Sequence, residues 1–102
     1  MPKYCMVNKL KTEHVGDYSS IHRNCWPEMR QALIDAGAKN CTVYVYGNTS
    51  ILFYECDNLD ESFAKLGEME ANKQWQTIVN PWFDSAEGFG IATADKVFDL
   101  FE

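Results

Sequence analysis

The sequence has no long apolar run, no basic track and no glycine-rich phosphate loop, and each absence excludes a class of protein. No segment approaches the roughly 20 consecutive apolar residues of a transmembrane helix, and the first residues form no secretory apolar stretch. The nine Lys and Arg residues are scattered through a chain of net charge −6, which argues against a nucleic-acid partner. We therefore expect a cytoplasmic protein that binds neither a membrane nor nucleic acid.

Signatures of nucleotide, metal and thiol chemistry are also missing. The glycines are isolated or, in the stretch 88–90, lack the rest of a nucleotide-binding fingerprint. His14 and His22 have no carboxylate or thiol at a spacing typical of metal sites. A nucleophilic pair of Cys25 with His22 would need an oxyanion site and an orienting group, for which the sequence offers no candidate. No CxxC motif occurs, so we expect four reduced and mostly buried thiols: Cys5, Cys25, Cys41 and Cys56.

The residues that are present indicate one globular domain over residues 1–102. Hydrophobic residues make up 46% of the chain and aromatic residues 14%, which supports a packed core and argues against disorder. A chain of this length buries only roughly two thirds of its unfolded surface. Association with a second copy is therefore expected to supplement the core.

The first half of the chain predicts a strand followed by helix. Residues 3–10 have strand-like content, and residues 13–36 change to helical spacing until Gly37 supplies a stop. Pro27 cannot lie deep inside a continuous helix without the loss of a hydrogen bond. We expect two helical pieces, with Asn24 as a cap between them.

The second half begins with a predicted β-hairpin, because residues 41–46 and 51–56 are rich in β-branched and aromatic side chains around the turn sequence GNTS. Residues 60–76 return to helical content. After the glycine-containing loop SAEGFG, Val97 and Phe98 are expected to begin a short terminal strand. The order β-α-β-β-α-β is that of the ferredoxin-like α+β fold, an antiparallel sheet with helices on one face.

Both faces of the predicted hairpin are apolar or aromatic. Val43 and Leu52 belong to one alternating set, and Tyr44, Tyr46 and Phe53 belong to the other. The helices can cover one sheet face, and the same face of a second copy would cover the other. We therefore expect a homodimer that forms a dimeric α/β barrel, with the second set near the shared interior.

The chemically most distinctive stretch is YSSIHRNCWPEM, residues 18–29, which places Tyr18, His22 and Trp26 four residues apart. A packing stripe would normally use Leu and Ile, which bring no polar atoms into the core. A histidine on a half-apolar face is often structural, but imidazole, with a pKa of roughly 6.5, can also take and give a proton at neutral pH. We expect the three side chains to line one wall of a pocket.

Trp75 and Trp82 lie in the polar stretch NKQWQTIVNPWF. Flat aromatic faces flanked by amide donors suit a sugar pocket, because a pyranose has apolar C–H faces and a polar edge. The alternative is that each indole covers the edge of the core, and the residues alone leave both interpretations open.

The pattern Y-x3-H-x3-WPE followed by GA-x-N resembles the L-rhamnose mutarotase family, and the similarity extends over nearly the whole chain. The residues that carry it are Tyr18, His22, WPE at 26–28, GAKN at 37–40, LF at 52–53, Trp75 and the terminal VF. The resemblance implies a ferredoxin-like dimer and an isomerase that interconverts the α and β anomers of a free 6-deoxy sugar without a cofactor. It also makes His22 the acid/base residue, with Tyr18 and Trp75 as sugar contacts.

The chain departs from the family pattern at two positions. Gln76 follows Trp75 where a tandem tryptophan pair is expected, and Cys41 follows the GAKN motif where a sugar-contacting tyrosine is expected. With Trp26, these residues complete the expected substrate-binding set. L-rhamnose is the expected sugar and L-fucose the alternative. A dimeric monooxygenase of the same fold and a non-catalytic ligand-binding module are the alternatives from other classes.

Overall fold

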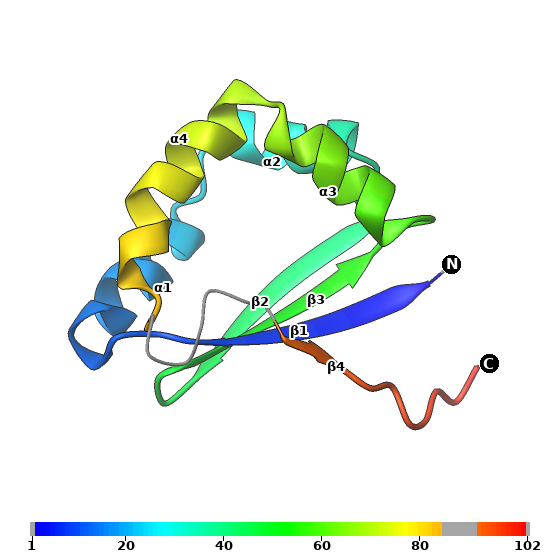
Figure 1. Ribbon diagram of the computed structural model, residues 1–102, viewed down its shortest axis with the longest axis horizontal. Coiled ribbons are helices and arrows are strands. Elements are labelled where there is room, and N and C mark those ends of the chain that lie inside the picture. The colour runs from blue at the N-terminus through cyan, green and yellow to red at the C-terminus, as the bar shows by residue number, and fades with distance from the viewer. Residues whose placement is uncertain (1, 85–91, 102) are drawn as a thin grey trace.

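The computed structural model describes residues 2–84 and 92–101, which fold into a four-stranded sheet and a layer of helices (Figure 1). The elements are β1 (Lys3–Lys9), η1 (Thr12–His14), α1 (Val15–Arg23), α2 (Pro27–Asp35), β2 (Asn40–Tyr46), β3 (Thr49–Glu55), α3 (Leu59–Gly67), α4 (Glu70–Val79), η2 (Asn80–Trp82) and β4 (Ala92–Ala94). The sheet has the strand order β2-β3-β1-β4, and every neighbouring pair is antiparallel. The helices lie on one face of the sheet, which confirms the predicted ferredoxin-like fold (Figure 1).

The last strand differs from the prediction. It comprises Ala92–Ala94 and pairs with β1 through Cys5 and Ala94. Continuation of this antiparallel register would bring Val97 level with Pro2, which precedes β1 and has no N–H to donate. Val97 is accordingly 93% exposed and Phe98 76% exposed, outside any strand. The predicted SAEGFG loop, at 85–90, lies outside the described residues.

The helical break at Pro27 follows the expected chemistry. Pro27 is the first residue of α2, where a missing N–H costs nothing, and Trp26 before it is extended, with φ −63° and ψ 140°. Asn24 caps the C-terminus of α1, because its backbone N–H and its side-chain Nδ2 both donate to the Ser20 carbonyl, at 3.1 and 2.9 Å. Asn24 therefore caps the chain between the two helices as the C-cap of α1, whereas Trp26 is the N-cap of α2.

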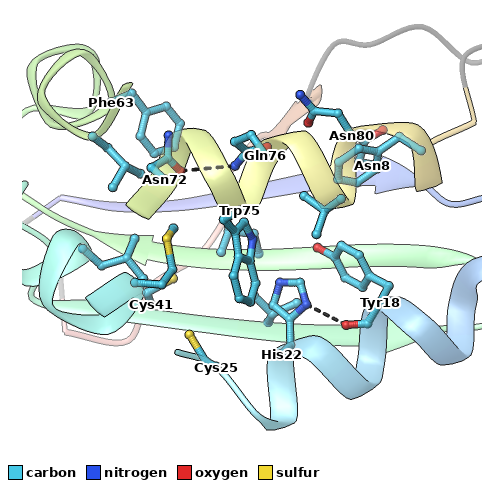
Figure 2. A pocket seen from close by; sticks show the side chains of 17 residues that line it. Asn8, Tyr18, His22, Cys25, Cys41, Phe63, Asn72, Trp75, Gln76 and Asn80 are labelled. Carbon is cyan, nitrogen blue, oxygen red and sulfur yellow. Dashed lines mark hydrogen bonds between the residues drawn. The ribbon is translucent and has the colours of Figure 1, made fainter. Parts of the chain in front are cut away.

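The helical content predicted over 60–76 is divided between α3 and α4, with Glu68 and Met69 between them. Asn58 begins α3 by accepting a hydrogen bond from the backbone N–H of Glu61 at 2.9 Å. The division turns α4 back over the sheet beside α2, and this turn places Trp75 and Gln76 above the strands (Figures 1 and 2).

The predicted hairpin is confirmed, and Gly47 forms its turn with φ +60°. Met6 and Tyr54 point from the sheet to the helices and are buried. On the opposite face Tyr44, Tyr46 and Phe53 are exposed, because no helix within the described residues covers them. The fold thus has one filled face and one open face.

The four cysteines are free, as expected, but their burial is less uniform than expected. Cys56 is buried, Cys5 and Cys25 are partly buried, and Cys41 is exposed. Cys41 differs from the expectation as a whole residue, because it lies on the edge strand β2 and is exposed.

Candidate active site

A cavity of about 390 Å³ lies between the helices and the inner face of the sheet (Figure 2). Five of the six predicted site residues line it: Tyr18, His22, Cys41, Trp75 and Gln76. They come from α1, β2 and α4, three elements that the fold brings together. Trp26 is the exception and does not line the cavity.

His22 lies near the end of α1, with its ring against Tyr18 and Trp75. The centroid of the His22 ring lies 4.1 Å from that of the Tyr18 ring and 5.1 Å from that of the Trp75 ring, which it meets edge-on. Nδ1 lies 2.7 Å from the backbone carbonyl oxygen of Tyr18, which can only accept, so Nδ1 carries the proton. Desolvation lowers the pKa of His22 below 6.5, and this hydrogen bond opposes the shift. The ring is therefore neutral at pH 7, with a lone pair on Nε2.

Nε2 of His22 forms no hydrogen bond within residues 2–84 and 92–101. In the same part of the chain no buried side-chain nitrogen or oxygen lacks a hydrogen-bond partner. Nε2 must therefore reach open space, which the cavity provides. The site offers a proton acceptor to whatever occupies the cavity.

Tyr18 contributes its phenol to the same wall of the cavity. Its Oη lies 2.7 Å from Oγ of Ser50 on β3, and its ring meets Phe83 edge-on at 5.8 Å. Desolvation raises the pKa of Tyr18, against the lowering effect of the Ser50 hydrogen bond, so the hydroxyl keeps its proton. Tyr18 is a hydrogen-bonding group at neutral pH rather than a charge.

Trp75 is buried, and its indole stands between the cavity and Trp26. The Trp26 ring packs edge-on against Trp75 at 5.1 Å, so Trp26 supports the cavity wall from behind. Trp26 fails to reach the cavity because the extended backbone before Pro27 ends the helical spacing that links Tyr18 to His22. Trp82 instead stacks on His14 at 5.9 Å, beyond the lining of the cavity.

Gln76 and Cys41, the two positions of departure, both line the cavity. Gln76 Nε2 donates to Oδ1 of Asn72 at 3.4 Å, which orients the amide. Although Cys41 is exposed as a residue, its side chain faces the cavity, where desolvation raises the pKa of the thiol to about 11, with a smaller contribution from Cys25. At neutral pH Cys41 presents a thiol and not a thiolate.

The sequence interpretation missed three asparagines in the cavity lining: Asn8, Asn72 and Asn80. Asn72 and Asn80 lie one helical turn before and after Gln76, so helical spacing from the predicted site residue could have identified both. Asn8 lies two residues after buried Met6, on the same face of β1. Amides on a predicted inner face were the available signal.

The lining contains no Lys, Arg, Asp or Glu among the described residues, and His22 is its one imidazole. The polar groups are amides, a phenol, thiols and an imidazole. A ligand that carries a phosphate or a carboxylate would find no counter-charge here. The cavity therefore suits an uncharged, hydroxyl-rich molecule with some apolar surface.

The fold and the cavity define a ferredoxin-like α+β protein with a neutral, proton-accepting pocket. The family model for L-rhamnose mutarotase matches residues 3–100. An L-rhamnose mutarotase from Ligilactobacillus salivarius is 37% identical over 101 residues, 92% of this chain and 93% of the relative. One from Lactiplantibacillus plantarum is 30% identical over 98% of this chain and 99% of the relative. The chain therefore belongs to the L-rhamnose mutarotase family.

Solved structures agree with this fold. An L-rhamnose mutarotase from Formosa agariphila superposes with a TM-score of 0.78 at 19% identity, over 98% of this chain and 99% of that one. A putative antibiotic biosynthesis monooxygenase from Nitrosomonas europaea reaches 0.67 at 14% identity, over 96% and 100%. At such identities the likeness shows the fold alone. The family match, and not the fold, selects an isomerase over a monooxygenase.

Proposed function

We propose that this protein interconverts the α and β anomers of L-rhamnose, with His22 as the acid/base group. The observation that carries the proposal is the neutral imidazole, whose Nε2 is open to an uncharged cavity in a chain of this family. A free sugar has no ionised group, and mutarotation requires only proton transfers.

The reaction uses one proton and one carbon–oxygen bond. His22 Nε2 takes the proton of the anomeric hydroxyl while the bond between C1 and the ring oxygen breaks, and its electron pair passes to the ring oxygen. A carbonyl forms at C1, and the imidazolium gives its proton to the ring oxygen. Rotation about the C1–C2 bond presents the other carbonyl face, and the same steps in reverse close the second anomer.

The other predicted residues have separate roles around this chemistry. Tyr18 donates a hydrogen bond to a sugar oxygen, because its hydroxyl keeps its proton and lines the cavity. Trp75 supplies the flat apolar surface that packs on the sugar ring. The Gln76 amide and the Cys41 thiol contact hydroxyls at the opposite side, while Trp26 holds the Trp75 ring in place.

The open sheet face supports a homodimer. Tyr44, Tyr46 and Phe53 expose aromatic surface on strands β2 and β3, and Tyr44 meets Phe53 edge-on at 5.7 Å. Two such faces packed against one another form the interior of a dimeric α/β barrel and remove this surface from water.

None of the helices in the described part of the chain could span a membrane. The cytoplasm is the proposed location of the enzyme.

Saturation-transfer NMR on the anomeric protons tests the reaction directly. L-rhamnose, L-fucose, D-ribose and D-glucose are compared with and without protein, and L-rhamnose is expected to exchange fastest. L-fucose remains the second candidate because Gln76 and Cys41 stand where the family has aromatic rings, which favours hydrogen bonding over stacking. If none of the four sugars exchanges faster than in buffer, the proposal is wrong.

A further inference from the structure

A buried pair of hydroxyl groups joins the cavity wall to the sheet. Ser50 lies on β3 opposite Asn8 and is 4% exposed, while Tyr18 is 6% exposed. Oγ of Ser50 and Oη of Tyr18 are 2.7 Å apart, and either atom can donate. Ser50 itself does not line the cavity, so it can act there only through Tyr18.

The acceptors available to each hydroxyl proton decide which hydroxyl donates. Each group has one proton, and Tyr18 Oη is the single hydrogen-bond partner of Ser50 Oγ in the part of the chain that the structure describes. If Tyr18 donated, the proton of the buried serine would have no acceptor, at a cost of about 1–3 kcal/mol. If Ser50 donates, both its proton and a lone pair of Tyr18 are satisfied. The Tyr18 proton then points elsewhere, and its hydroxyl end is directed toward the cavity (Figure 2).

We infer that Ser50 is a positioning residue that donates to Tyr18 and thereby turns the Tyr18 hydroxyl proton into the cavity. The inference rests on the proposed function and adds to it the orientation of the Tyr18 hydroxyl proton. The wall then presents one acceptor, Nε2 of His22, beside one donor, Oη of Tyr18. This combination suits mutarotation, because the anomeric hydroxyl loses a proton while the adjacent ring oxygen gains negative charge.

Tyr18 takes part in both hydrogen bonds that set the acceptor and the donor. The backbone carbonyl of Tyr18 fixes the proton of His22 on Nδ1, and the Tyr18 side chain receives the Ser50 proton. The ring centroids of Tyr18 and His22 are 4.1 Å apart, so the acceptor and the donor belong to adjacent side chains of one cavity wall.

The fold provides a matched control. Tyr54 and Ser62 form a second buried hydroxyl pair between β3 and α3, with Oη and Oγ 2.6 Å apart. Neither residue lines the cavity. Ser62→Ala therefore removes the same chemical group from a comparable buried pair without any change at the proposed site.

Kinetics on four variants test the route through Tyr18. Ser50→Ala should lower the rate constant for L-rhamnose exchange about tenfold, the equivalent of one lost hydrogen bond, with a smaller change in KM. In a Tyr18→Phe background the same change should have no further effect, and Ser62→Ala should retain the wild-type rate. An equal loss in both backgrounds, or an equal loss in Ser62→Ala, would show that Ser50 acts only through general packing and would overturn the inference.

Neutron diffraction on perdeuterated wild-type crystals locates the two deuterons without a variant or a substrate. The Ser50 deuteron is expected on the line to Tyr18 Oη, and the Tyr18 deuteron is expected to point into the cavity. A Tyr18 deuteron directed at Ser50 would overturn the inference even in an active enzyme. Absence of wild-type exchange would overturn the proposed function instead, so the two failures are distinguishable.

Discussion

Replacement of His22 by Ala removes the proposed acid/base group at little structural cost. The Tyr18 carbonyl loses its bond to Nδ1 but keeps the helical bond from the backbone N–H of residue 22, so no buried acceptor is orphaned. One side-chain hydrogen bond contributes about 1 kcal/mol to the free energy of unfolding. The ring contacts with Tyr18 and Trp75 add to the loss, yet His22 itself is only partly buried. The variant is expected to fold.

The effect on the reaction should be much larger. A positioned acid/base group contributes typically about 10²- to 10⁴-fold, so His22→Ala should lose most of the catalysed exchange. The assay is saturation-transfer NMR on L-rhamnose, with the melting temperature measured on the same sample. His14→Ala is the matched control, because His14 pairs with Asp17 at 3.0 Å and stacks on Trp82 outside the cavity lining.

Two results would refute this reasoning. Full activity in folded His22→Ala would remove His22 from the proton transfer. Loss of folding in His22→Ala but not in His14→Ala would assign His22 a structural role.

The remaining predictions concern pH, the thiols and assembly. Because desolvation lowers the pKa of His22, the exchange rate should hold at pH 7 and fall only below pH 6.5. The free energy of unfolding should also decrease below pH 6.5, because the unfolded chain binds the His22 proton more tightly than the folded protein does. An exchange rate that falls as the pH drops from 8 to 7 would contradict this prediction. With its pKa at about 11, Cys41 in the folded protein should react slowly with iodoacetamide at pH 7. After denaturation all four thiols should react without a reductant, and mass spectrometry that finds a pair requiring reduction first would refute the expected free state. Light scattering at micromolar concentration should show a wild-type dimer. The variant Phe53→Lys should be monomeric, because the dimer would bury the lysine charge. A stable wild-type monomer would rule out the paired-sheet assembly.

The part of the site on α1 was predictable from local spacing. Tyr18 and His22 are one helical turn apart, so any helix over this stretch places both on one face. The same spacing does not carry Trp26 into the cavity lining, because the residue before Pro27 is extended and ends the helical geometry. Helical spacing thus predicted which side chains share a face only within one continuous helix.

Contacts between distant segments were not predictable in this way. Ser50 is one of several polar residues near the hairpin turn, and nothing in its neighbours identifies Tyr18, 32 positions earlier, as its partner. The terminal strand was misplaced for a related reason, since Val97 has strand-like character but the register with β1 ends before it. Strand propensity depends on the available neighbour as much as on the residue.

The hydrogen bond that sets the tautomer of His22 ends on a main-chain oxygen, and this has a consequence for substitutions at position 18. Every amino acid carries that oxygen, so substitutions at position 18 leave the protonation pattern of the imidazole intact as long as α1 persists. A substitution at position 18 can therefore change the group that the cavity wall presents while the lone pair of His22 stays on Nε2. The main chain of residue 18 thus sets the tautomer of His22, and its side chain decides which further group the cavity wall presents.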